Sequence, residues 1–229
     1  MRPLPHSLTR ITRIHPPAPH RYDQHSIRNA PAHDPERARR VVRELSTVAD
    51  VVEEVAPIAR RDIGSPKNLG DLDIVTIGCW GNAIQITDPA FAENGTTTYN
   101  LDNAFDAQVQ AHPDARIAAA CEMDFSQTYA KYLIHVPGAP RVSADGWDET
   151  DVTGDLVEAL RACGIDPSGP GTENLDYDDP DTFVWGDYLD LVACGLHIPF
   201  ATESLQVSVF RVTRPEETRD DMEEAWQQD

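Results

Sequence analysis

The stretch LDIVTIGCWGNAIQITDP, residues 72–89, contains two short runs that are rich in β-branched residues. The runs, 72–77 and 83–87, lie on either side of a segment that includes Gly81 and Asn82. β-Branched residues favour strands, and glycine and asparagine favour the backbone angles of tight turns. The stretch therefore predicts an antiparallel hairpin.

Other segments predict further strands of the same sheet. Residues 117–123 and 129–136 fit both a helical and an alternating pattern, and we favour two strands there. Residues 203–215 alternate apolar and polar side chains and predict a closing strand that ends before Pro215. Residues 196–201 predict a second closing strand.

Four segments predict helices. The first begins with Asp34 as its N-cap and Pro35 at the first helical position, and its apolar residues recur every three or four positions until Pro57. The other three segments are 101–113, 153–164 and 180–194. We therefore predict the α+β class, an antiparallel sheet of hairpins with about two to four helices packed on one face.

Two short stretches of the chain resemble each other. LRACGID (160–166) and LVACGLH (191–197) share a leucine, an alanine, a cysteine and a glycine at the same positions. In each, the predicted helix ends in a buried cysteine, and the following glycine supplies the positive φ of a helix stop. The similarity does not extend upstream, so we interpret the pair as one structural device used twice, and not as a chemical site.

Residues 1–33 differ from the rest of the chain in composition. They carry five arginines, six prolines and one acid, and they include five of the eight histidines. This composition predicts a disordered basic arm before a single α+β domain, 34–214, and an acidic C-terminal helix or tail, 215–229. The arm histidines could chelate a transition metal, but their irregular spacing favours disorder. They are His6, His15, His20, His25 and His33.

The net charge of −20 is the strongest compositional feature. It comes from 25 Asp and 14 Glu against 17 Arg and only two Lys. A dense carboxylate surface stays hydrated when salt screens its self-repulsion, so the composition is typical of a salt-adapted protein, although a high-GC genome also favours Arg over Lys. In either case the negative field repels nucleic acids and anionic membranes.

The distribution of apolar residues and cysteines predicts a cytoplasmic protein. No apolar run approaches the roughly 18 residues of a membrane span, and the proline-rich start lacks the apolar core of a secretory signal. The four cysteines are widely spaced, without a CxxC pair, which is typical of reduced, buried thiols and not of a metal site. They are Cys79, Cys121, Cys163 and Cys194.

Known catalytic and cofactor signatures do not occur in the sequence. The acidic runs that begin at Asp176 and at Glu149 both fail the spacing of a calcium loop. There is no GxSxG, HExxH or phosphate-loop pattern, so we expect no cofactor. If the protein is an enzyme, the candidate residues are His135 or His197 beside Cys79 or a carboxylate.

The sequence leaves three functional hypotheses open. The first is a non-catalytic cytoplasmic protein that binds another protein, because aromatic residues occur in segments that look exposed, at Trp80, Trp147 and Trp226. The second is a small hydrolase or metal-dependent enzyme whose site is assembled from distant His and carboxylate residues. The third is an acidic mimic of nucleic acid. Oligomeric state is not predicted.

Overall fold

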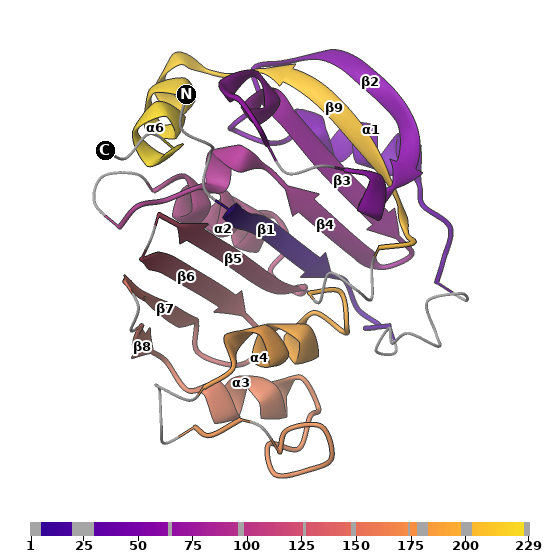
Figure 1. Ribbon diagram of the computed structural model, residues 1–229. Coiled ribbons are helices and arrows are strands. Elements are labelled where there is room, and N and C mark those ends of the chain that lie inside the picture. Colours follow the sequence, from indigo (N-terminus) through magenta and orange to yellow (C-terminus); the bar gives the residue numbers. More distant parts are fainter. Residues whose placement is uncertain are drawn as a thin grey trace.

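The structure consists of a single large sheet with helices on both faces. The computed structural model describes residues 6–19, 30–63, 66–95, 99–125, 127–147, 150–173, 175–177, 183–197 and 203–226. Within them, nine strands form one sheet in the order β2-β9-β3-β4-β1-β5-β6-β7-β8, and all neighbouring strands are antiparallel (Figure 1). The predicted α+β class is confirmed.

The strands are β1 (His6–Ile14), β2 (Asp50–Ala59), β3 (Ile74–Trp80), β4 (Ala83–Thr87), β5 (Arg116–Asp124), β6 (Thr128–His135), β7 (Val142–Trp147), β8 (Asp151–Thr153) and β9 (Gln206–Thr213). The α-helices are α1 (Pro35–Arg43), α2 (Asn100–Ala111), α3 (Leu156–Ala162), α4 (Trp185–Val192) and α6 (Glu216–Trp226). Short 3-10 turns are η2 (Arg60–Asp62), η3 (Leu69–Asp73) and η4 (Pro89–Phe91).

The first strand corrects the prediction of a disordered arm. β1 lies in the middle of the sheet, between β4 and β5, so the prediction is wrong for residues 6–14 and the domain does not begin at residue 34. Four of the six prolines that suggested disorder follow the strand, and the buried Ile11 and Ile14 anchor it on opposite faces of the sheet. Arg10 and Arg13 are tolerated there because each forms a hydrogen bond in the interior.

The first predicted helix is also corrected. Asp34 does cap α1, since its carboxylate accepts a hydrogen bond from the Arg37 backbone N–H at 3.0 Å. The helix ends at Arg43, however, and residues 50–59 form the edge strand β2, which pairs with β9. The valine-rich segment fits a helical period and a strand equally well, and strand pairing with β9 prevails.

The predicted hairpins are confirmed. β3 and β4 pair around Gly81, whose φ of 57° lies in the left-handed region that favours glycine. The ambiguous segments 117–123 and 129–136 form β5 and β6, and the predicted closing strand is β9. The second predicted closing strand does not occur at residues 196–197, and 198–201 lie outside the described residues.

The later helices are confirmed with changed boundaries. The segment 101–113 forms α2. α3 begins later than the predicted segment, because Asp155 is its cap and accepts the Glu158 backbone N–H with its side chain at 2.8 Å. α4 is shorter than predicted, and residues 180–182 of that prediction lie outside the described residues.

The two similar stretches do end helices. Gly164 has a φ of 75° and Gly195 a φ of 83°, as the helix-stop interpretation requires. In addition, both stretches meet at Arg116, which donates to the Cys163 carbonyl at 2.9 Å and contacts the Cys194 Sγ at 3.9 Å. Burial raises the pKa of the Cys163 thiol to about 11, so this thiol is protonated at neutral pH.

Helices cover both faces of the sheet, not one. Successive residues of β5 alternate between a core beneath α1, α2 and α6 and a second core beneath α3 and α4. Trp80 and Trp226 lie in the interior, at 1% and 3% exposed, so the expectation that they are surface residues is wrong. No helix in the described part of the chain combines the length and apolar character needed to cross a membrane.

Candidate functional site

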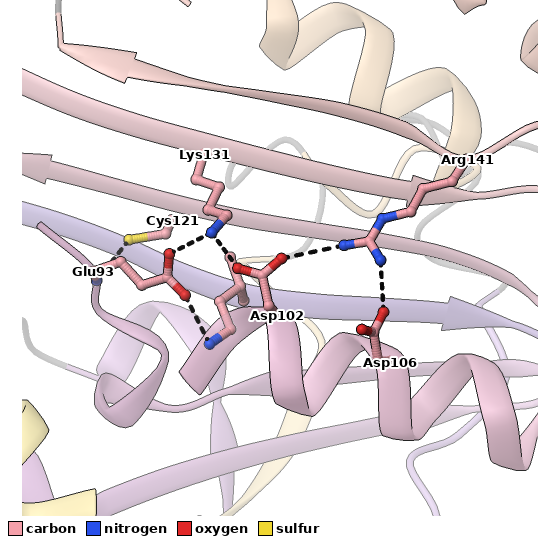
Figure 2. A network of polar contacts seen from close by, with 7 residues as sticks. Glu93, Asp102, Asp106, Cys121, Lys131 and Arg141 are labelled. Atoms are coloured by element: carbon pink, nitrogen blue, oxygen red, sulfur yellow. Dashed lines mark hydrogen bonds and ion pairs between the residues drawn. The ribbon is translucent and has the colours of Figure 1, made fainter. Parts of the chain in front are cut away.

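A buried carboxylate begins a charged network on the face of the sheet that α2 covers (Figure 2). Glu93 follows η4, and its backbone N–H donates to the Cys121 Sγ on β5 at 3.3 Å. Its carboxylate accepts the Leu101 backbone N–H of α2 at 3.1 Å. The side chain is 1% exposed, so the position of Glu93 depends on these contacts rather than on solvent.

Lys131 on β6 links Glu93 to helix α2. Its ammonium lies 2.7 Å from Glu93 Oε2 and also contacts the carboxylate of Asp102, in the first turn of α2. The Tyr99 ring covers the same ammonium, with its centroid 5.8 Å from Nζ. One of the two lysines of the chain is thus enclosed by two carboxylates and an aromatic ring.

The network continues from Asp102 to the surface. Arg141 donates to Asp102 Oδ1 at 3.2 Å and to Asp106 Oδ1, one helical turn further along α2, at 2.7 Å. Side-chain exposure rises from 1% at Glu93 through 25% at Asp102 to 60% at Asp106. We call these five residues, Glu93, Lys131, Asp102, Arg141 and Asp106, the Glu93 network.

Burial controls the protonation of the network. It raises the pKa of Glu93 to about 7, although the Lys131 ammonium opposes the shift. Burial alone would lower the pKa of Lys131, but attraction to Glu93 and Asp102 outweighs it and holds this pKa above its ordinary value. Around neutral pH the lysine is therefore charged, while Glu93 is poised to gain or lose a proton.

The raised pKa of Glu93 predicts a pH-dependent stability. The folded protein binds this proton more tightly than the unfolded chain, so the contribution is fully present below the ordinary pKa of 4.5 and is lost as the pH rises through about 7. Over that window the loss amounts to about 3 kcal/mol. Urea unfolding of wild type and Glu93→Gln between pH 5 and 8 measures it, since the difference between the two curves isolates Glu93. A constant difference across this range would contradict the prediction.

Aromatic side chains adjoin the network on the same face of the sheet. Trp147 on β7 packs on Tyr129, its partner across the strands, at 5.4 Å between ring centroids, and on Phe125 at 6.0 Å. Trp147 remains 38% exposed and Tyr99 59% exposed. Asp145, exposed on β7 opposite Lys131, adds a carboxylate. We call Tyr99, Phe125, Asp145 and Trp147, together with the buried Tyr129 on which Trp147 packs, the Trp147 surface.

A comparison with known protein families identifies the family of this chain. A model described as "Family of unknown function (DUF6333)" matches residues 2–229. The chain belongs to the DUF6333 family. No curated protein and no solved structure matches it. The function of this DUF6333 protein therefore has to be argued from its own residues.

The three residues predicted for an enzyme lie apart in the DUF6333 protein. Cys79 on β3 and His135 on β6 are separated by strands β4, β1 and β5, which corresponds to roughly 19 Å across the sheet. His197 follows α4 and is buried, and its backbone carbonyl accepts a hydrogen bond from Arg10 on β1. The structure does not bring these residues together.

The environments of the predicted residues also differ. Burial raises the pKa of the Cys79 thiol to about 12, and burial together with Arg10 and Arg60 lowers the pKa of His197 to about 3. His135 lies near the surface with its Nε2 3.0 Å from the Pro113 carbonyl. At neutral pH Cys79 is a thiol and His197 is a neutral imidazole, neither of which carries charge.

The histidine next to Cys79 comes from the segment predicted to be disordered. His33 Nδ1 accepts the Cys79 backbone N–H at 3.2 Å, so in the neutral ring Nε2 carries the proton. Nε2 lies 2.9 Å from Ser208 Oγ and therefore donates to it. With this tautomer, His33 cannot accept the serine proton and does not activate Ser208 as a nucleophile.

The residues considered for cation binding, namely the acidic run from Asp176 and the arm histidines, belong only in part to the described residues. Among the described residues, no group of three or more His, Cys, Asp or Glu side chains is arranged to hold a metal ion. Residues 178–182 of the acidic run and the arm histidines His20 and His25 lie outside the described residues.

Sequence reasoning missed the Glu93 network because its members come from separate segments. Glu93, Asp102 and Lys131 lie on a loop, a helix and a strand. The sequence offered one usable signal, since Lys131 is a rare lysine at an alternating position of a predicted strand where a buried apolar residue would be expected. A buried lysine requires a carboxylate partner, but only the fold identifies it.

Proposed function

We propose that this DUF6333 protein is a non-catalytic binding protein that recognises a basic segment of a partner protein through the Trp147 surface. The observation that carries the proposal is the exposure of Trp147, at 38%, within an acidic part of a chain with a net charge of −20. Exposed aromatic side chains are enriched where proteins bind other proteins.

Charge complementarity selects a basic partner. The two cations beside the surface, Lys131 and Arg141, each contact two carboxylates of the Glu93 network. The exposed carboxylate of Asp145 adds a further negative charge to the Trp147 surface. An arginine side chain can stack on an exposed indole while its charge is attracted by carboxylates, so both features favour the same ligand group.

The Trp147 surface is also preorganised. Trp147 lies on a strand and packs on Tyr129 across the β6–β7 pair. Gly95 approaches so closely that a β-carbon there would lie 2.9 Å from Tyr129 Cε2 and 3.2 Å from Trp147 Nε1. A rigid aromatic side chain loses little conformational entropy on binding, which favours affinity.

A peptide-binding measurement tests the proposal. The probe is a tryptophan-free nona-arginine peptide, and binding is followed by calorimetry and by tryptophan fluorescence at low and molar KCl. We expect Trp147→Ala to weaken binding at least tenfold, and binding to weaken as salt rises. The control Val184→Ala removes another exposed apolar side chain, 44% exposed at the start of α4, and should bind as wild type does.

Two outcomes would overturn this function. The first is equal affinity of wild type and Trp147→Ala for the peptide, which would mean that only the general charge is recognised. The second is a concentration-dependent dimer in sedimentation that Trp147→Ala abolishes, because the occupant of the surface would then be a second copy of the chain.

We further propose that the protein is cytoplasmic and that its acidic surface is an adaptation to salt. The support is the excess of Asp over Glu and the near absence of Lys in the sequence. Thermal unfolding from low to molar KCl separates this role from binding. Stability that rises steeply with KCl supports salt adaptation. Full stability at low salt contradicts it, and would mean that the carboxylates serve to bind the basic partner.

A further inference from the structure

Basic side chains gather at one end of the central strand, between α1 and α2, at a distance from the Trp147 surface along the sheet. Arg13 on β1 and His15 just after it lie beneath Arg37 of α1 and His112 at the end of α2. We call these four residues the basic cluster. Such a grouping is unusual on a chain with a net charge of −20.

Direct contacts join the members of the cluster. The His15 and His112 rings meet edge to face, with centroids 5.2 Å apart. Arg13 donates from Nη1 to Gln108 Oε1, one turn before His112 on α2. The β3–β4 turn holds the other side, because Arg37 Nη1 donates to the Gly81 carbonyl at 2.5 Å and the His15 backbone N–H donates to the adjacent Asn82 carbonyl at 2.9 Å.

Within the described part of the chain, two nitrogen atoms of the cluster have no hydrogen-bond partner. They are Arg13 Nε, on a side chain that is 3% exposed, and His15 Nε2. A buried polar group without a partner destabilises the fold, and such groups in a native protein often mark the position of a ligand. Both unpartnered atoms belong to neighbouring residues at the same end of β1, so one ligand could serve both.

The charge balance around the cluster favours an anion. The facing charged and titratable groups are Arg13, Arg37 and Glu44, the buried Cys79 thiol, and the two histidines. Burial, the largest cause, and the neighbouring Arg37 lower the pKa of Arg13 to about 10, although Glu44 and Cys79 oppose the shift. Burial, Arg13 and Arg37 lower the pKa of His15 to about 4. Around Arg13 the repulsion from Arg37 exceeds the attraction of either opposing group, Glu44 or Cys79, and this favours an added negative charge.

We propose that the basic cluster binds a phosphate group, either as inorganic phosphate or as the phosphate of a small soluble metabolite. Two guanidinium groups match the double negative charge of phosphate, and their planar donor groups suit its oxygens. The unpartnered nitrogens of Arg13 and His15 supply further donors when the imidazole is protonated or in the appropriate tautomer. The surrounding acidic surface excludes larger polyanions such as nucleic acids.

Titration of the full chain with inorganic phosphate tests the site. Calorimetry at constant ionic strength should give saturable binding, at least tenfold weaker in Arg37→Gln. Arg39→Gln is the matched control, because Arg39 belongs to the same helix but pairs with Glu36 and Glu54. Its affinity for phosphate should equal that of wild type. Arg13→Gln should weaken binding further, and Arg37→Gln keeps the test valid if the buried substitution unfolds the protein.

A second measurement reports on the site itself. In an NMR pH titration, bound phosphate should raise the pKa of the His15 and His112 rings, because an adjacent anion favours the charged imidazolium. His15→Asn assigns the His15 signal. Phenyl phosphate in place of inorganic phosphate distinguishes a metabolite site, where it binds more tightly, from a site for the free ion.

The proposal is overturned if phosphate binding is not saturable, or if Arg37→Gln and Arg39→Gln bind phosphate with equal affinity. It is also overturned if phosphate does not change the pKa of the His15 and His112 rings. Because the peptide experiment on the Trp147 surface involves other residues and another ligand, failure of either proposal leaves the other standing.

Discussion

Replacement of Asp88 by alanine is expected to lower the free energy of unfolding by about 3–5 kcal/mol, the cost of leaving a buried charge without its partner. Asp88 and Arg214 are 0% and 1% exposed, and two parallel contacts of 2.8 and 3.0 Å join the carboxylate to the guanidinium. This is the most deeply buried ion pair that the described part of the chain contains.

The pair also connects segments that are distant in sequence. Arg214, at the end of β9, donates to the carbonyls of Thr47 and Leu72, and Asp88 accepts from the Thr47 hydroxyl at 2.6 Å and the Ala90 backbone N–H at 2.9 Å. Loss of the carboxylate therefore removes the nearer charge partner of Arg214 and the cap of η4 in one substitution, and leaves the guanidinium only the Asp73 carboxylate at 3.8 Å among its ion pairs in the described residues.

Urea unfolding measures the effect. The control Asp62→Ala removes an exposed carboxylate that lies 3.9 Å from Arg61 and should leave stability unchanged, because such a pair is screened by solvent. The double variant Asp88→Ala/Arg214→Met should be more stable than Asp88→Ala alone, since it also removes the buried charge that Asp88 had neutralised. A loss below about 1 kcal/mol for Asp88→Ala would contradict the interpretation of this pair as a structural contact.

Replacement of Lys131 by methionine is expected to destabilise the protein by a similar amount, about 3–5 kcal/mol, and by more at high pH than at low pH. Among the described residues, Lys131 is the only cation that forms an ion pair with Glu93, and it shares Asp102 with Arg141. Without its ammonium the carboxylate of Glu93 remains buried and loses the interaction that opposes the rise of its pKa.

The sign of the pH dependence follows from this pKa. A higher pKa of Glu93 in the folded variant extends the range over which the folded state holds the extra proton. The variant should therefore keep losing stability above pH 7, by up to about 1.4 kcal/mol per pH unit, where the wild-type contribution of Glu93 has levelled off. At pH 5 the two proteins should differ least.

Lys67→Met provides the matched control for this experiment. Lys67 is the other lysine of the chain and lies exposed. Its replacement changes the net charge by the same amount as Lys131→Met, but removes no contact of the Glu93 network. Its unfolding curves should follow those of wild type at each pH. Parallel pH profiles for Lys131→Met and wild type would show that Glu93 does not titrate in the way described, and would remove the basis for its raised pKa.

Several elements of this fold could be predicted because their signals are local. The β3–β4 hairpin depends on β-branched runs on either side of Gly81, and the start of α1 depends on Asp34 and Pro35. The stop of α3 depends on Gly164. Each signal involves residues a few positions apart, where backbone geometry and side-chain hydrogen bonds act without the rest of the chain.

Other elements could not be predicted because distant partners decide them. β1 looked like part of a disordered arm, but its strand pairs with β4 and β5, which supply the hydrogen bonds and cover the side chains. β2 carries a pattern compatible with a helix, and only pairing with β9, at the other end of the chain, makes it a strand. Tertiary context often overrides local preference in this way.

The candidate sites show the same division. The sequence by itself determined the charge of the protein, its hairpins, its helix caps and the rarity of lysine, since these depend on composition and short-range geometry. Only the tertiary structure decided that Lys131 meets Glu93 and Asp102, that Trp147 is exposed while Trp80 and Trp226 are buried, and that His15 and Arg37 both contact the β3–β4 turn. The physical reason is that burial and electrostatic partnership are properties of positions in space, which strand pairing sets over long stretches of sequence.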